Sequence, residues 1–416
     1  MQRQYWDWFK NGLLFGLIAS VAIAFLNVPI SPRSLPEDAG ETRGVWLTNV
    51  NSGVLFVPWG IQRAVHSLAK LHFNTLYPVV WNRGNTFFPS KIATEATGRD
   101  REPFFQLMHP NTDVLQEILD EAHRQGLKVI PWFEYGLMTP KGSALAKQHP
   151  EWLTQSLDRQ RKEYRDAFQD SAETKKTFKL PNLFAIHQVW LNPLHPEVKA
   201  FIKGIILEVV KNYDIDGIQV DDHFGMPVEM GYDDLTIQIY KEEHQGKLPP
   251  KDPHDARWMG WRANKITELM TEIYQEIKAV KPDCIISLSP NSQSYAYTHY
   301  LQNWQVWVAR GIIDELILQV YRSDRDRFIQ ELSLPPVRFA KQHIPVSIGI
   351  LSGVLSKPVP MQTIQEQVRI VRDRGFSGVS FFYWESLWGY IAPESPYRRR
   401  QGFKDLFWQG TPENEG

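Results

Sequence analysis

Gly217-Ile-Gln-Val-Asp221-Asp222-His223-Phe224 is a short apolar run that ends in two carboxylates and an imidazole. An apolar run of this length predicts a strand that is covered on both faces, as in a parallel sheet between helices. Parallel-barrel enzymes carry their chemistry at the carboxyl ends of the strands. The acids after this strand therefore predict a functional site there.

Seven similar runs lie along the chain, and helical patterns such as Val114–Arg124 and Ile364–Arg374 separate many of them. Strands that alternate with helices predict a parallel sheet with right-handed crossovers, and eight of them close a barrel. We therefore expect an α/β fold, a (β/α)8 TIM barrel. The predicted strands are Gly44–Asn49, Thr75–Trp81, Lys128–Glu134, Gly217–Asp222, Ile285–Pro290, Glu315–Tyr321, Pro345–Leu351 and Gly378–Glu385.

The segments after three of the strands are long: Asn82–Pro110, Tyr135–His195 and His223–Pro253. Long loops on one rim of a barrel usually build the site. We expect Tyr135–His195 to be a structureless lid or wall of that site.

The amino terminus contains a nearly uncharged run of 19 residues, Gly12–Ile30. As a helix this run would span about 28 Å, close to the thickness of a bilayer's hydrocarbon core. Arg3 and Lys10 precede it, which predicts that the barrel lies on the periplasmic or extracellular side of the cell membrane. The alternatives are a cleaved signal peptide and a buried core helix. The expected organisation is an anchor (1–30), a linker (31–42), the catalytic barrel (43–407) and a disordered tail (408–416).

The composition bears on the class of ligand. Lys plus Arg number 46 and Asp plus Glu 47, so the chain has no strong net field and no nucleic-acid partner is expected. The single cysteine, Cys284, lies in an apolar run and predicts a buried thiol. Fifteen Trp and fifteen Tyr offer rings that stack on sugars, although most such rings are core. Nothing in the sequence sets the oligomeric state.

Three predicted strands end in acids. Asp221 and Asp222 follow strand four, Glu134 ends strand three, and Glu385 ends strand eight. A fixed carboxylate stabilises an oxocarbenium-like transition state, and a glutamate in an aromatic pocket is kept neutral, as a general acid requires. The alternatives are a helix cap or a salt bridge for the aspartates, and pairing of Glu134 with Arg43 or Arg83.

Polar and aromatic groups at the same strand ends are candidates for binding sugar hydroxyls and faces. Individually each is more often loop structure than ligand contact, so we consider them as a set. The predicted substrate-binding residues are Trp81, Asn82, Trp132, Tyr135, His223, Asn291, Gln319, Tyr321, Arg322 and Trp384.

No metal or cofactor is expected. The sequence has no Walker-type loop and no Gly-x-Gly-x-x-Gly motif after a strand. Metallohydrolase barrels usually carry paired histidines on the first strand, whereas Gly44–Asn49 has none.

The chain resembles the bacterial glycosyl-hydrolase-like family ten. The resemblance rests on Arg43-Gly-Val-Trp-Leu-Thr-Asn-Val50, Phe73-Asn-Thr-Leu-Tyr77, Gly217–Phe224 and Phe382-Tyr-Trp-Glu-Ser-Leu387, with similar patterns at His149–Leu153 and Leu191–Val198. It implies an envelope-associated barrel that cleaves polysaccharide, including peptidoglycan glycan strands, with Asp221 and Asp222 in the catalytic centre.

The chain departs from that family at two positions. His223 stands where the family often has Tyr, and Arg322 where it often has Trp. Arg322 favours an acidic sugar or a lactyl carboxylate.

The residues and the resemblance together predict a glycoside hydrolase that acts through a carboxylate pair. Asp221 is expected to be the nucleophile or base and Glu134 the acid, with Glu385 and Asp222 next in line for the acid. The alternatives are a non-catalytic carbohydrate-binding barrel and a metal-dependent polysaccharide deacetylase.

Overall fold

The computed structural model describes residues 40–50, 52–57, 60–158, 188–354, 357–388 and 393–407. The predicted anchor (1–30) and tail (408–416) lie outside these residues. Within them, no helix is both long and apolar enough to cross a membrane.

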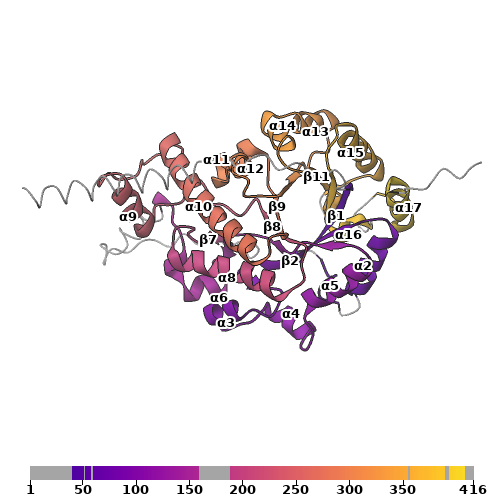
Figure 1. Ribbon diagram of the computed structural model, residues 1–416, viewed down its shortest axis with the longest axis horizontal. Helices are drawn as coiled ribbons and strands as arrows, with labels where there is room; N and C mark the ends of the chain where they lie inside the picture. Colours follow the sequence, from indigo (N-terminus) through magenta and orange to yellow (C-terminus); the bar gives the residue numbers. More distant parts are fainter. Residues whose placement is uncertain are drawn as a thin grey trace, which may run out of the picture.

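Parallel strands form a closed barrel surrounded by helices, the TIM-barrel architecture (Figure 1). Each predicted strand is present, although the third is split around Ile130 and Pro131. The barrel strands are β1 (Thr42–Leu47), β2 (Thr75–Asn82), β4 and β5 (Lys128–Val129 and Trp132–Phe133), β8 (Gly217–Asp221), β9 (Ile285–Ser289), β10 (Glu315–Gln319), β11 (Val346–Leu351) and β14 (Gly378–Phe382).

The barrel closes by pairing its first strand with its last. β1 pairs in parallel with β2 on one side and with β14 on the other, so the first and last barrel strands are neighbours. This is visible where indigo β1 lies beside the yellow elements in Figure 1.

At least one helix follows each barrel strand. The predicted helical segments are found as α5 (Val114–Arg124) and α15 (Met361–Asp373). The other helices are α2 (Gly60–Lys70), α3 (Lys91–Thr97), α4 (Pro103–Met108), α6 (Ala144–Gln148), η1 (Pro150–Trp152), α8 (Pro196–Asn212), α9 (Asp234–Glu243), α10 (Ala256–Val280), α11 (Gln293–Tyr300), α12 (Trp304–Ala309), α13 (Arg325–Leu332), α14 (Pro335–Lys341), α16 (Trp384–Leu387) and α17 (Pro396–Phe407).

The barrel interior is filled by side chains. The Trp46 indole donates to Gln219 (Nε1 to Oε1, 2.7 Å), and Gln219 donates in turn to Ser287 (2.9 Å). Trp46 also stacks on Tyr77 and meets Trp132 edge to face. A barrel interior packed with side chains is a core and not a pore, so we expect a ligand to bind above it, at the rim formed by the strands' carboxyl ends.

The expectation of a structureless segment after strand three is wrong for its described residues. β6 (Met138–Pro140) pairs antiparallel with β7 (Gln188–Trp190), and α6 and η1 lie between them. A bridge between Ser156 and Met230 joins this segment to the loop after β8. The rim therefore has a structured wall on this side. Two short hairpins complete the rim, formed by β3 (Asn85–Thr86) with β2 and by β12 (Gly353–Val354) with β13 (Lys357–Pro358).

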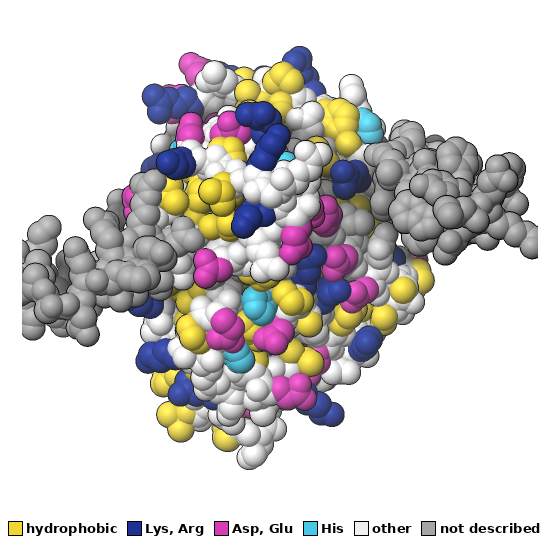
Figure 2. Space-filling view, turned by 90° about the vertical axis from the view of Figure 1, so that its left-hand side faces the viewer, with side chains coloured by type: hydrophobic (Ala, Val, Ile, Leu, Met, Phe, Trp, Pro, Cys, Tyr) yellow, Lys and Arg dark blue, Asp and Glu magenta, His cyan; other side chains and the backbone are white. Residues whose placement is uncertain are grey.

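Charged side chains of both signs are interspersed on the face that Figure 2 shows, with small apolar groups among them. This agrees with the nearly balanced composition. Cys284 is buried, as predicted, and burial raises the pKa of its thiol to about 11.

Candidate active site

Asp221 is the last residue of β8. Side chains two residues apart on a strand point to the same face, so Asp221 faces the barrel interior as Gln219 does. The carboxylate is buried and accepts hydrogen bonds from two backbone N–H groups, those of His223 (2.9 Å) and Tyr135 (3.3 Å). The Gln302 amide fixes the backbone by donating to the Asp221 carbonyl (2.8 Å). These contacts hold a buried negative charge in one position, as a nucleophile or charge stabiliser requires.

Asp222 lies just beyond the strand and is held by two side-chain amides, one from the loop after β9 and one from the end of β10. Asn291 donates to Oδ2 (2.7 Å) and Gln319 donates to Oδ1 (3.0 Å). Burial raises the pKa of Asp222, and the negative charge of Asp221 adds to this effect. Its side chain thus links β8 to the ends of β9 and β10.

His223 lies between the two aspartates. Its Nδ1 is 3.5 Å from an oxygen of each. Burial alone would lower the pKa of His223, but the carboxylates of Asp222 and Asp221 outweigh burial and raise it to about 10. The imidazole ring stacks on Tyr135, with 4.9 Å between ring centroids. His223 is therefore a cation at neutral pH that balances part of the negative charge.

Glu134 follows β5 and is buried on the same rim. One oxygen, Oε2, accepts hydrogen bonds from the Thr48 hydroxyl and the Asn82 amide, both at 2.9 Å. Burial raises the pKa of Glu134 to about 8, and the negative charge of Asp221 contributes to the rise. Among the described residues, no ion pair joins Glu134 to Arg43 or Arg83, although the positive charge of Arg83 lowers the pKa of Glu134. At neutral pH Glu134 is protonated, whereas the neighbouring Asp221 is a fixed carboxylate. Glu134 can therefore act as the acid and Asp221 as the charged partner.

Glu385 has different surroundings. It lies on α16 rather than at a strand end, and its Oε1 accepts from Ser52 and from the backbone N–H groups of Gly53 (3.0 Å) and Val54 (3.2 Å). Burial raises its pKa. Its nearest partners belong to the loop after β1, so Glu385 positions that loop, while its Oε2 has no hydrogen-bond partner.

Seven of the predicted substrate-binding residues surround the acids. Asn82, Asn291 and Gln319 contact Glu134 or Asp222 directly, and Tyr135 and His223 stack on each other. Trp132 and Tyr321 both pack against Phe382. Burial raises the pKa of Tyr321 well above its usual value, and Asp222, Asp221 and Glu134 act in the same direction.

The other three predicted binding residues are placed differently. Trp81 is buried against Phe201 of α8 and donates to the Gly136 carbonyl, because consecutive strand residues alternate and Asn82 takes the inward face. Arg322 pairs with Glu331 (2.9 Å). Trp384 packs on Trp388.

Two polar residues of the site were not predicted from the sequence. Thr48 donates to Glu134, and Asn49 accepts from Asn82 (2.6 Å). Both directly follow β1, and the rule that carboxyl ends carry the site would have identified them.

Asp221, Asp222 and His223 also offer ligand atoms that lie within 4.8 Å of one another, close enough for a metal ion. However, N–H groups already point at oxygens of both carboxylates. These residues therefore fit an ion-paired cluster better than a metal site.

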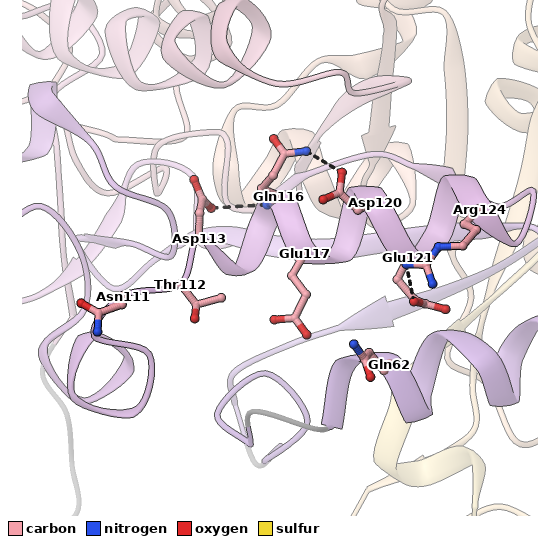
Figure 3. Close-up of a pocket in the computed structure, with 9 residues that line it drawn as sticks. All are labelled: Gln62, Asn111, Thr112, Asp113, Gln116, Glu117, Asp120, Glu121 and Arg124. Atoms are coloured by element: carbon pink, nitrogen blue, oxygen red, sulfur yellow. Dashed lines mark hydrogen bonds and ion pairs between the residues drawn. The ribbon is translucent and has the colours of Figure 1, made fainter.

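A cavity of about 390 Å³ lies elsewhere, on the outer surface between α2 and α5 (Figure 3). Glu117 and Glu121 of α5 face Gln62 of α2 across it. Its lining contains no aromatic side chain and none of the rim acids. We do not assign it to the candidate site.

Comparisons with known proteins agree with this fold. A family model described as glycosyl hydrolase-like 10 matches residues 41–370. The glycosyl hydrolase DigH of Escherichia coli strain K12 is 27% identical over 327 residues, covering 70% of this chain and 67% of the relative. The glycosyl hydrolase YngK of Bacillus subtilis strain 168 is 23% identical over 326 residues, covering 68% of this chain and 54% of the relative, so the chain spans about half of its length.

Solved structures resemble the whole barrel. The glycoside hydrolase domain of PgaB (BpsB) from Bordetella bronchiseptica superposes with a TM-score of 0.61 at 13% identity, over 89% of this chain and 100% of that one. The catalytic domain of β-amylase from Paenibacillus polymyxa gives a TM-score of 0.54 at 11% identity, over 90% and 98%. At these identities the likeness concerns the fold alone.

Proposed function

The chain belongs to the glycosyl hydrolase-like 10 family, and from this premise we propose that it is a glycoside hydrolase that cleaves an O-glycosidic bond of a cell-envelope polysaccharide. The observation that carries the proposal is the pairing of a protonated glutamate, Glu134, with a fixed carboxylate, Asp221, on one barrel rim. Glycosidases of both stereochemical types use one acid in each of these states.

In the proposed mechanism Glu134 donates its proton to the leaving oxygen. Asp221 faces the positive charge that develops on the sugar ring and acts as nucleophile or as base for water. Asp222 and His223 position Asp221 by completing the charged cluster, while Thr48 and Asn82 orient Glu134. Trp132 and Tyr321, which both pack against Phe382, provide rings for a sugar to contact.

The substrate we favour is a glycan of the envelope, including peptidoglycan glycan strands. Support comes from the rings and amides at the rim and from the apolar run Gly12–Ile30, which as a membrane anchor would hold the barrel beside the envelope. The anchor is tested by fractionation. Full-length protein recovered in the soluble fraction with its amino terminus intact would contradict it.

The catalytic assignment is tested with two variants on purified peptidoglycan and neutral glucans, with products analysed by mass. Asp221→Asn should lower turnover by about 1,000-fold or more while sugar binding persists, since it removes charge and keeps shape. Glu134→Gln should be equally damaging on natural glycans but mild on aryl glycosides whose leaving group needs no proton. Asp373→Asn, at an exposed position of α15, is the matched control. Wild-type turnover in Asp221→Asn and Glu134→Gln would remove both residues from the mechanism.

A metal-dependent deacetylase is the second candidate, because Asp221, Asp222 and His223 lie close enough to share an ion. We expect glycan cleavage to survive exhaustive chelation. Release of acetate that chelation abolishes and zinc restores would favour the deacetylase instead.

A further inference from the structure

The hairpin of β2 and β3 is closed by an unusual two-residue turn. Asn82 pairs with Asn85, and the turn residues Arg83 and Gly84 have φ of +54° and +76°. Positive φ at both positions defines a type I′ turn, in which Asn-Gly is strongly preferred. A long side chain with a Cβ atom is disfavoured at the first position. Residues held in such a conformation cluster at functional sites, where the side chain is used.

The turn cannot relax away from its position. A Cβ atom on Gly84 would lie 2.5 Å from the Thr139 hydroxyl of β6, so the turn packs closely against β6. The Arg83 side chain is thereby directed over the Tyr135 ring, with Cζ 5.8 Å from the ring centroid. Tyr135 in turn stacks on His223, and the charge of Arg83 acts on Glu134, so the guanidinium lies near the rim acids.

The charge of Arg83 is not compensated by a neighbouring acid. In the described part of the chain Arg83 forms no ion pair with a carboxylate. Its side chain hydrogen-bonds the Tyr135 hydroxyl, and its buried Nε has no hydrogen-bond partner. The positive charge acts on Glu134, which is uncharged at neutral pH. Arg322, by contrast, is already paired with Glu331.

We infer that Arg83 forms an anion subsite beside Glu134 that binds an acidic substituent, a carboxylate, on the sugar of the substrate. The inference rests on the proposed function, because it names the sugar class for that site. A planar guanidinium binds a carboxylate in two parallel hydrogen bonds, which an ammonium cannot reproduce.

The test compares a carboxylate-bearing oligosaccharide with the same oligosaccharide after reduction of its carboxyl groups. Affinity is measured calorimetrically in the Asp221→Asn background, and kcat/KM is measured in the otherwise native chain. Arg83→Asn should weaken binding of the acidic form at least 10-fold and leave the reduced form unchanged. It should also raise Tm, because Asn suits the turn. Arg83→Lys should show an intermediate loss, and Arg338→Gln, an exposed arginine of α14, should show none.

Equal affinities of the wild type for the two oligosaccharides, or an equal loss for both in Arg83→Asn, would overturn the subsite. If the selective loss of binding appears but the native enzyme hydrolyses neither oligosaccharide, the subsite stands and the proposed function fails. A lower Tm in Arg83→Asn would show that the turn needs arginine for structural reasons and would also contradict the inference.

Discussion

The proton on Glu134 couples stability to pH. Its folded pKa of about 8 is above the ordinary value of 4.5, so the folded state holds a proton that the unfolded state loses as pH rises through that window. Folding is therefore penalised increasingly between pH 4.5 and 8. Glu134→Gln should relieve this penalty, giving little change at pH 4 and stabilisation of up to about 4 kcal/mol at pH 9. Urea unfolding at both pH values measures the difference, and an equal effect at both would contradict the buried-acid assignment.

His223 should show the opposite dependence. The pKa of His223 in the folded state is raised to about 10. The protonated imidazole therefore contributes its full stabilisation below pH 6.5, and this stabilisation is lost as pH rises through 10. His223→Gln should destabilise the protein by about 3 kcal/mol at pH 6, because two carboxylates lose their counter-charge, and by less at pH 9.5. Tyr135→Leu removes the stacked ring but not the charge, so it serves as the control with no such pH trend.

Single residues were the hardest feature to predict. The position of Asp221 and Glu134 at the rim follows from the sequence, because both end apolar runs that form barrel strands. The prediction for Trp81 is wrong because two adjacent strand residues cannot both face the rim acids, and Asn82 is the one that contacts Glu134. The loop contacts of Glu385 depend on Ser52, Gly53 and Val54, more than 300 residues away, and no local pattern shows such a contact.

Among the elements, α17 has a supporting role. Its Arg399 is fully buried and donates to four backbone carbonyls, those of Leu387, Val359, Ser352 and Ser386. Ser386 and Leu387 belong to α16, which also carries Glu385. α17 thus holds the end of the last barrel strand in place.

Arg399→Met should therefore destabilise the barrel by about 3 kcal/mol or more, because it leaves several buried carbonyls without donors. Arg398→Met, at the exposed neighbouring position, should be nearly neutral. Thermal unfolding of the two variants provides the comparison, and similar Tm values would remove α17 from this role.

At the scale of the whole molecule, the periodicity of the sequence predicted every barrel strand, since each is a short apolar run that helices cover. It did not predict the β6–β7 hairpin, whose strands are only three residues each and belong to no repeat.

The barrel should fold without the residues that precede it, because β1 begins at Thr42 and its partners are β2 and β14. A chain that lacks residues 1–39 should give the same circular dichroism spectrum and retain glycan cleavage. A fragment that stops at residue 370 is the contrasting variant, since it lacks β14 and should not fold. Folding of the shorter fragment, or failure of the longer one, would contradict this account.

β1 leaves the ribosome long before the strand that completes its pairing. Roughly 330 residues separate Leu47 from Gly378, and at about 5–20 residues per second their synthesis takes tens of seconds. During that time one edge of β1 is open to wrong partners, so a holdase that shields apolar strands should improve yield. A premature stop codon late in the gene would produce a chain that contains Glu134, Asp221 and His223. Because such a chain lacks β14, it should stay unfolded and be degraded by proteases.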